Sequence, residues 1–311
     1  MSELSIEARS LSKRYGRLVA VDQLSFDVGA GEVLGFLGPN GAGKSTTMKM
    51  LTGFLAPTSG TARVNGPDIV EDSLAARRCM GYLPEGAPAY GEMTVRRFLE
   101  VVARARGFPG HEAVQAARAA IARLNLHGDP EQRVETLSKG FKRRVGLAQA
   151  ILHDPRVLIL DEPTDGLDPN QKHEVRELIR DMSSDKIIII STHILEEVHA
   201  LCNRAMIISD GRLLVDDSPD GLIARSRYHD AVTLVVEEPE RVATPLSELP
   251  QSRKVELREG ELTVFPRPGE HLLEVITDTI REHDGSVSEL RLEAGRLDEV
   301  FRQVTKEEVL R

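Results

Sequence analysis

The chain has 311 residues, of which 41% are hydrophobic and 29% charged, so its composition is that of an ordinary soluble globular protein with room for one large and one small domain. Its formal net charge of −9 is uneven, because residues 1–227 hold 29 Lys and Arg against 30 Asp and Glu, whereas residues 228–311 hold 11 against 19. This shift predicts a domain boundary near Ser226–Asp230, and the acidic tail argues against binding to nucleic acid, which requires a basic face.

The first elements lead into a glycine-rich loop. Strands are expected at Leu4–Ser10 and Leu18–Val28, with a polar turn at Lys13–Gly16 between them, and the apolar run Val33–Leu37 is a further strand. The loop after this strand matches the phosphate-loop pattern G-x-x-x-x-G-K-[ST] and consists of Gly38, Pro39, Asn40, Gly41, Ala42, Gly43, Lys44, Ser45 and Thr46. Thr46–Leu51 follows as a helix, and strand, loop and helix together form the context that this motif requires.

The chemistry of this loop points to a nucleoside triphosphate. Glycines let the backbone wrap closely around a phosphate chain, and successive N–H groups and the helix N-terminus then point at the anion. Lys44 supplies a positive charge for the terminal phosphates, and Ser45 supplies a hydroxyl for Mg²⁺. A chance match is the alternative, and the flanking strand and helix make it rare.

Helical periodicity dominates the middle of the chain, over about residues 94–153. Apolar residues recur at steps of three and four in three segments, Val95–Arg106, His111–Leu124 and Phe141–Leu152. These helices form an insertion between the first strands and the later ones. The basic run Lys142–Arg144 lies on the third helix, where we expect it on a solvated or intradimer face rather than at nucleic acid.

Strands and helices then alternate again. Strands are expected at Arg156–Leu160, Lys186–Ser191, Arg204–Ser209 and Arg212–Asp216, and helices at Asn170–Met182 and Ile194–Leu201. Continuous apolar strands separated by helices predict a largely parallel sheet covered on both faces. The longest apolar runs are of strand length, so none approaches the roughly 20 residues that span a bilayer.

The acidic tail has its own order of elements. Strands are expected at Ala231–Glu237, Ser252–Arg258, Glu261–Phe265 and Ser286–Leu292, with a turn at Glu259-Gly260, and helices at Glu240–Leu249, Pro268–His283 and Gly295–Thr305. The order β-α-β-β-α-β is that of a ferredoxin-like unit.

The strand expected at Arg156–Leu160 is followed directly by two acids, Asp161 and Glu162. Carboxylates at the carboxyl edge of a parallel sheet lie where ligands bind in such folds. Mg²⁺ prefers carboxylate and phosphate oxygens, so Asp161 suits a metal-binding role, and Glu162 suits the activation of a water aimed at the terminal phosphate. The alternative is a helix cap, since acids before helices are common.

Several further motifs resemble those of ATP-binding cassette (ABC) ATPases, in the order and spacing of that family, over roughly residues 4–225. Leu137-Ser138-Lys139-Gly140-Phe141 stands where the family has its signature motif, shortly before the acid-ended strand. Asp165–Pro169 resembles the D-loop, and His193, at a strand end, resembles the switch histidine. Tyr15 stands where the family has an adenine-stacking aromatic side chain.

The resemblance implies an α/β fold, namely a P-loop NTPase cassette of the ABC type over residues 1–226. It would have a mixed sheet and the helical insertion, followed by a small acidic α+β domain of ferredoxin-like order over residues 228–311. Two cassettes would pair head to tail around two ATP molecules with Mg²⁺. The implied catalytic residues are Glu162 and His193, and the metal ligands are Ser45, Glu85 and Asp161. The implied nucleotide contacts are Tyr15, Gly38, Asn40, Gly41, Ala42, Gly43, Lys44, Ser45, Thr46, Glu85, Ser138, Gly140 and Asp168.

Two departures from the family pattern affect this site. In the signature, usually L-S-G-G-Q, Lys139 replaces a glycine and Phe141 a glutamine. Lys139 either adds charge near the γ-phosphate or points to solvent, and we expect solvent. Glu85 stands where the family usually has a glutamine, and it either adds negative charge near the metal or acts as a tolerated near-isostere.

The function implied is that of an ATP-hydrolysing motor subunit of a transporter, similar to the type-2 ABC exporter group. The chain would work on a separate integral membrane permease, held peripherally at the cytoplasmic face of the inner membrane, without nucleic acid. One alternative is a soluble ABC ATPase of translation or DNA maintenance, which usually carries two cassettes or a long coiled coil. Another is an inactive regulatory subunit, which the intact Lys44, Asp161 and His193 oppose.

Overall fold

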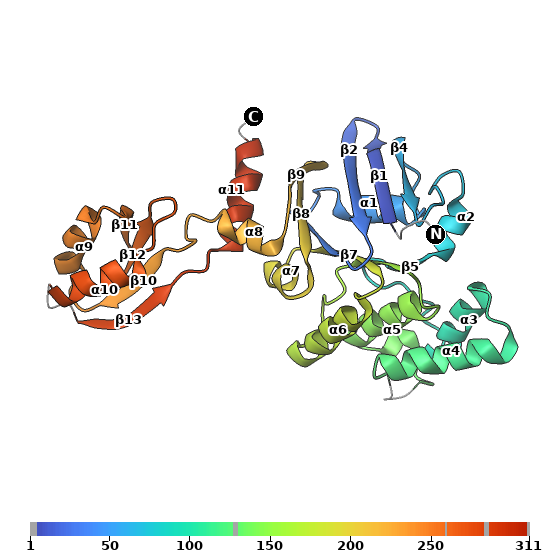
Figure 1. Cartoon of the computed structure of the whole chain (residues 1–311). Helices are drawn as coiled ribbons and strands as arrows, with labels where there is room; N and C mark the ends of the chain where they lie inside the picture. Colours follow the sequence, from blue (N-terminus) through green and yellow to red (C-terminus); the bar gives the residue numbers. More distant parts are fainter. Residues whose placement is uncertain (1–4, 127–129, 259, 283–285, 310–311) are drawn as a thin grey trace. The chain divides into compact units, whose positions relative to one another are not determined.

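The structure of the protein is a computed structural model that describes residues 5–126, 130–258, 260–282 and 286–309. It divides the chain into two compact units, Met1–Pro219 and Asp220–Arg311, both drawn in Figure 1. The division falls N-terminal to the boundary near Ser226–Asp230 that the charge distribution predicts. Leu4, Glu259 and His283, at which expected elements begin or end, lie outside the described residues.

The first unit contains a small antiparallel sheet that the sequence did not separate from the rest. It consists of β1 (Ser5–Tyr15), β2 (Leu18–Gly29) and β4 (Ser59–Val64), in the order β2-β1-β4. The turn predicted at Lys13–Gly16 is wrong for its first three residues, because β1 continues to Tyr15, which pairs with Leu18 across the hairpin. Pairing with β2 therefore outweighs the polar character of this stretch.

A six-stranded sheet, in the order β5-β6-β7-β3-β8-β9, forms the centre of the first unit. Its strands are β3 (Val33–Leu37), β5 (Met80–Leu83), β6 (Val157–Asp161), β7 (Ile187–Thr192), β8 (Arg204–Ser209) and β9 (Arg212–Asp217). All neighbours are parallel except β8 and β9, so the predicted largely parallel sheet is confirmed. Every residue of β6 and β7 is buried, as the four consecutive isoleucines of β7 require.

The two sheets enclose helix α1 (Lys44–Leu51), which contacts both β2 and β6. Met48 of α1 shares one hydrophobic core with Leu24 of β2 and Ile189 of β7. The opposite face of the large sheet packs against helices, because Gly81 of β5 lies against α5 (Lys139–Ile151) and Gly35 of β3 against α7 (Leu195–Leu201). This core fixes α1 directly beneath the carboxyl end of β3, where the glycine-rich loop begins.

The helices of the predicted insertion occur close to their expected ranges. They are α3 (Val95–Ala105), α4 (Gly110–Arg123), the short 3₁₀ helix η1 (Val134–Thr136) and α5, and α3 and α4 both pack against α5, as Figure 1 shows. Outside the insertion lie α2 (Ser73–Arg78) and α6 (Pro169–Met182). In the part of the chain that is described, no helix combines the length and the apolar character needed to cross a membrane.

The second unit is a four-stranded antiparallel sheet with two helices on one face. Its elements are β10 (Val232–Val236), α9 (Pro239–Glu248), β11 (Ser252–Arg258), β12 (Glu261–Pro266), α10 (Leu273–Glu282) and β13 (Val287–Leu292). The strand order β11-β12-β10-β13 interleaves the two β-α-β halves, which is the ferredoxin-like arrangement. Leu234, Leu246 and Ile276 lie in its separate core. The helix α8 (Pro219–Ala224), which the sequence did not predict, precedes this sheet, and α11 (Leu297–Val309) follows it.

Candidate nucleotide-binding site

The glycine-rich loop closes around its own lysine. The Lys44 side chain is almost fully buried, and its Nζ donates hydrogen bonds to the carbonyl oxygens of Gly38 at 2.6 Å and Pro39 at 3.0 Å. Burial lowers the pKa of Lys44, whereas nearby carboxylates, led by Glu162, act to raise it. The loop therefore holds a desolvated cation beside acids, which is an arrangement that a phosphate group would complete.

Two glycines of the loop occupy places that no other residue can take. A Cβ at Gly38 would overlap the carbonyl oxygen of Ile208, and Gly43 has a φ of +101° with the Ala20 carbonyl oxygen 2.5 Å from its hypothetical Cβ. Gly43 also caps α1 without any side-chain hydrogen bond, so the first N–H groups of this eight-residue helix face the loop. Asn40 and Gly41 are exposed at the loop tip, Ala42 is buried, and Ser45 and Thr46 are half-buried in the first turn of α1.

Asp161 lies within reach of Ser45 at the carboxyl end of β6. Ser45 Oγ donates to Asp161 Oδ1 at 3.4 Å, and the hydroxyl of Ser191 donates to the same oxygen. Asp161 Oδ2 is buried and has no hydrogen-bond partner among the described residues. A hydroxyl and a carboxylate with one free oxygen are hard donors of the kind that Mg²⁺ binds, so these two residues fit that ion.

The donor atoms at this site fit a metal ion that the protein and a bound nucleotide would hold together. No group of three His, Cys, Asp or Glu side chains within the described ranges could hold a metal ion. Mg²⁺ is commonly bound by one or two carboxylates together with substrate phosphates and waters. Ser45 and Asp161 would supply the hydroxyl and the carboxylate of such a shared site.

The two residues predicted to be catalytic contact each other. Glu162 follows β6 and His193 follows the neighbouring strand β7, and the Nδ1–H of His193 donates to Glu162 Oε1 at 2.9 Å. Glu162 has a φ of +51°, a left-handed conformation that costs a non-glycine residue roughly 1–2 kcal/mol. Its N–H donates to the Ser191 carbonyl oxygen at 3.0 Å, which fixes this conformation. The parallel sheet thus brings an acid and a histidine from distant segments to one edge.

Tyr15 and Glu85 lie at the margin of this cluster. Tyr15 is half-exposed at the end of β1, and the Lys13 ammonium lies 5.4 Å from the centre of its ring. The hairpin that carries Tyr15 adjoins the phosphate loop, because Ala20 of β2 contacts Gly43. Glu85 is exposed after β5, and its charge is among those that act to raise the pKa of Lys44. Its metal-binding role stays a prediction.

Comparison with known proteins decides the family. A profile described as "ABC transporter" matches residues 21–165. The chain is 37% identical over 256 residues to Nod factor export ATP-binding protein I of Paraburkholderia xenovorans (strain LB400), which covers 82% of this chain and 84% of that protein. It is 39% identical over 252 residues to the protein of the same name from Burkholderia orbicola (strain AU 1054), with coverage of 79% and 82%. The chain belongs to the ABC transporter family.

Solved structures of ABC proteins have the same fold. One described as an ATP-binding subunit of an ABC transporter matches 70% of this chain and 91% of its own with a TM-score of 0.65 at 30% identity. A dimeric ATP-binding cassette in a post-hydrolysis state, bound to ADP and Pi, matches 69% of this chain and 98% of its own with a TM-score of 0.64. At 20% identity that second likeness shows the fold alone. The α/β cassette fold predicted from the sequence is confirmed.

The ABC signature and the D-loop form a second group of residues. Ser138 is exposed and caps α5, since its Oγ accepts the N–H of Phe141 at 3.2 Å, and Asp168 caps α6 by accepting the N–H of Gln171 at 2.9 Å. Gly140 is packed so closely that a Cβ would lie 2.8 Å from Gln171 Oε1. The roles of Ser138, Gly140 and Asp168 toward a nucleotide stay predictions, because this group lies on α5 and α6 rather than around Lys44.

Two basic residues of the signature helix are more buried than the sequence suggested. Lys139 is exposed to solvent as expected, and it also forms an ion pair with Asp165 of the D-loop at 2.8 Å. Arg143 and Arg144 are almost fully buried, so the expectation of a solvated or intradimer face is wrong for both. Arg143 donates to the Asp161 carbonyl oxygen at 3.3 Å and pairs with Asp165 at 3.4 Å. It therefore links α5 to the end of β6 and to the D-loop.

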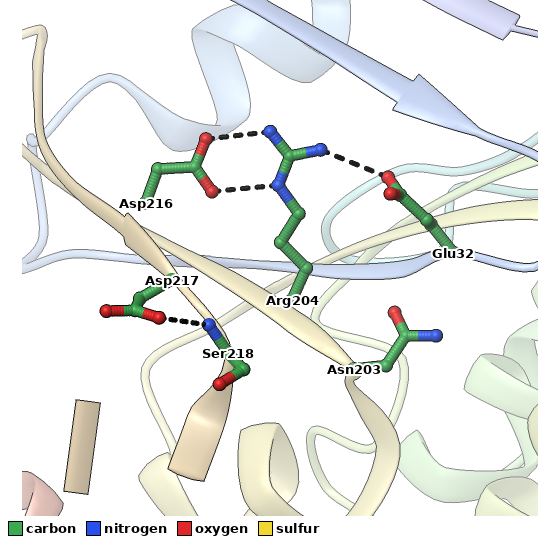
Figure 2. A pocket seen from close by; sticks show the side chains of 6 residues that line it. All are labelled: Glu32, Asn203, Arg204, Asp216, Asp217 and Ser218. Atoms are coloured by element: carbon green, nitrogen blue, oxygen red, sulfur yellow. Dashed lines mark hydrogen bonds and ion pairs between the residues drawn. The ribbon is translucent and has the colours of Figure 1, made fainter. Parts of the chain in front are cut away.

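A surface pocket at the opposite end of the large sheet is a structural feature rather than a nucleotide site. Figure 2 shows its lining, in which Arg204 at the start of β8 donates two hydrogen bonds to Asp216 of β9 at 2.7 and 2.8 Å and a third to Glu32 at 3.1 Å. Glu32 precedes β3, whereas the phosphate loop follows it. Arg204 thus joins β8, β9 and the start of β3 at the sheet edge that faces away from Lys44.

Proposed function

We propose that the chain is the ATP-hydrolysing motor subunit of an ABC exporter of the type-2 group, which works as a head-to-tail homodimer on a separate membrane permease. The observation that carries this proposal is the meeting of Lys44, Asp161 and the Glu162–His193 pair at the carboxyl edge of one parallel sheet. These are the groups that phosphoryl transfer to water requires, namely a cation for the phosphates, a metal ligand, a water-orienting acid and a phosphate contact.

Each group has a distinct chemical task in this proposal. Lys44 would exchange the carbonyl oxygens of Gly38 and Pro39 for phosphate oxygens. Ser45 and Asp161 would hold Mg²⁺, which neutralises charge that develops on the phosphates. Glu162 would orient and deprotonate the attacking water, with its carboxylate positioned by the hydrogen bond from His193. His193 is half-exposed, so its ring can also reach a terminal phosphate.

The proposal of a dimer rests on the separation of the two groups of site residues. Lys44 and Glu162 lie at one edge of the sheet, whereas Ser138 lies exposed at the N-terminus of α5, where backbone N–H groups and the helix dipole favour an anion. Head-to-tail pairing would place Ser138 and Gly140 of one copy against the phosphates held by the other. A solved cassette with the same fold is described as dimeric, which supports the pairing of two copies.

The proposal of export through a permease rests on the relatives and on exposed apolar side chains. The relatives at 37% and 39% identity are named as export ATP-binding proteins. Large apolar residues that water would disfavour stand exposed near α2 and the loop of Glu85, namely Phe54 at 76%, Leu74 at 66% and Tyr90 at 64% exposure. A permease that covers them would hold the chain peripherally at the cytoplasmic face of the inner membrane.

The substitution Glu162→Gln tests the motor function. We expect the purified variant to bind ATP with unchanged affinity, to hydrolyse it about 10²- to 10⁴-fold more slowly, and to accumulate an ATP-dependent dimer, because the amide cannot take a proton from water. Turnover by a phosphate-release assay and mass by light scattering would measure this. Normal turnover of Glu162→Gln would contradict the proposed role, and Glu196→Ala, an exposed acid on α7, serves as the control.

A further inference from the structure

A buried carboxylate joins the two strand ends that carry Glu162 and His193. Glu197 lies in the first turn of α7 and is 1% exposed. Its Oε1 accepts the hydroxyl of Thr164, and its Oε2 accepts the hydroxyl of Thr192 at 2.9 Å. Both threonines are equally buried, so the three side chains form a closed clamp within the protein.

Each threonine of this clamp lies within two residues of a proposed catalytic residue. Thr164 lies two residues after Glu162, and its carbonyl oxygen accepts the N–H of Leu167 at 3.2 Å, which closes the D-loop turn. The hydroxyl of Thr192 gives its only proton to Glu197 and accepts the N–H of Ile194 at 3.0 Å. The backbone of His193 is therefore held on both sides.

Support of the backbone matters at both catalytic positions, for different reasons. The His193 side chain is 53% exposed, and Glu162 stands in a left-handed conformation that its neighbours must maintain. Catalysis of phosphoryl transfer depends chiefly on positioning, and a displacement of about 1 Å reduces rates about 10²-fold. Fully bonded buried polar networks supply such rigidity, and partly bonded ones do not.

We infer that Glu197 is a positioning residue for ATP hydrolysis, which holds Glu162 and His193 in register by bonding Thr164 and Thr192 and touches no nucleotide itself. The inference rests on the proposed function. On this inference the start of α7 couples His193, the proposed γ-phosphate contact, to the D-loop, because the Glu197 carboxylate bonds Thr164 and Thr192.

The test compares Glu197→Ala, Glu197→Gln and Thr192→Val with the control Glu196→Ala, which removes the exposed neighbouring acid. We expect kcat to fall at least about tenfold in Glu197→Ala and less in Glu197→Gln, whose amide oxygen can still accept one hydroxyl. The Kd for ATP should stay within about twofold, and Glu196→Ala should behave as wild type. The double variant Glu197→Ala/Thr192→Val should lose no more kcat than Glu197→Ala, because both changes break one network.

A second readout does not depend on activity. The amide proton of Ile194 should exchange faster with solvent in Glu197→Ala and in Thr192→Val. Its acceptor, the Thr192 hydroxyl, is no longer held in the first variant and is absent from the second. If Glu197→Ala does not fold, the isosteric Thr192→Val and Thr164→Val carry the same expectations. A Glu197→Ala kcat within twofold of wild type, or additive losses in the double variant, would overturn the inference. A wild-type protein without ATP turnover would instead overturn the proposed function, and the exchange of Ile194 would still test the clamp.

Discussion

Asp165 of the D-loop pairs with two cations of α5 whose burial differs. Lys139 has a side chain that is 70% exposed, whereas that of Arg143 is 3% exposed, and both bind the same oxygen, Asp165 Oδ2. The hydrogen bond from Lys139, supported by the charge of Arg143, holds the pKa of Asp165 below its usual value. Because water screens the first pair and not the second, the two contacts should differ in energetic weight although they share a partner.

We predict that Lys139→Gln lowers the free energy of unfolding by about 0–1 kcal/mol and that Arg143→Gln lowers it by about 3 kcal/mol or more. Arg143 also donates to the backbone carbonyl oxygen of Asp161, so its loss leaves buried acceptors without partners. Urea titrations at low and high salt measure both effects. Equal losses for the two variants, or a salt-dependent loss for Arg143→Gln only, would contradict this account.

At this scale the sequence predicted the residues that occur in contiguous motifs. Gly38–Ser45, Asp161-Glu162 and His193 could be predicted because each lies in a short pattern that favours one chemical role. Glu197 could not, since its partners Thr164 and Thr192 are near only after two strands align. A weak signal existed, because Glu197 falls on the apolar face of a short helix beside Val198 and Leu201. The burial of Arg143 could not be predicted, because the sequence of a basic run does not determine which of its side chains are exposed.

The end of α5 is fastened to β5 by His153. Its Nε2–H donates to the Met80 carbonyl oxygen at 3.0 Å, and its Nδ1 is buried without a partner among the described residues. Burial, assisted by the charge of Arg106, lowers the pKa of His153 from 6.5 to about 4. Between these two values the unfolded chain binds a proton that the folded chain does not, so folding stability falls as the pH drops through this interval and levels off below it.

We predict that His153→Gln removes this part of the pH dependence. The wild type should lose about 1–2 kcal/mol more than the variant between pH 7 and pH 4, after allowance for the partial exposure of the ring. Chemical unfolding at several pH values measures the two slopes. His111→Gln, on the exposed face of α4, is the control and should keep the wild-type slope. Parallel slopes for wild type and His153→Gln would show that His153 is not protonated differently in the two states.

Elements were predicted better than their pairing. The isoleucine run of β7 and the periodic helices α3 and α4 lie close to their expected ranges, because burial on both faces or on one stripe leaves a strong pattern. The separation of β1, β2 and β4 into a second sheet was missed, since pairing depends on contacts far apart in sequence. The helix α8 was missed because six residues give too short a periodicity.

Each of the two units has a hydrophobic core of its own. The first centres on Met48 and Ile189, and the second on Leu234 and Ile276. Residues at the end of α8 and just after it contact the second unit, because the Ile223 carbonyl oxygen lies against Gly295 and Ser226 Oγ donates to Glu299 of α11 at 2.7 Å. The charge shift near Ser226–Asp230 therefore marks a change in composition, whereas the boundary between the two packed units falls at the start of α8.

This difference yields a prediction for truncated chains. A protein that ends at Pro219 keeps the whole first core, so we expect it to fold, to bind ATP and to hydrolyse it. A protein that ends at Arg227 retains α8 and Ser226 but loses Glu299, which bonds the Ser226 hydroxyl and the Arg227 N–H, so we expect a lower solubility and no gain in thermal stability. Melting temperature and light scattering of the two proteins measure this, and a higher melting temperature for the longer one would place the boundary after α8.

The shorter protein also tests the role that we propose for the tail, which is regulation of the motor or contact between its two copies. The second unit lies outside the residues that the family profile matches, which end at Asp165, and its fold needs none of the nucleotide-site side chains. If the tail acts on the dimer, the 1–219 protein should bind ATP as the full chain does but differ in ATP-dependent dimerisation, turnover or recovery with its permease from membranes. Glu162→Gln, introduced into the full chain and into the 1–219 protein, separates regulation of turnover from contact between the two copies. This variant should trap the dimer and remove turnover from the comparison. Equal dimerisation, turnover and membrane recovery for both lengths would exclude a role of the tail in the motor.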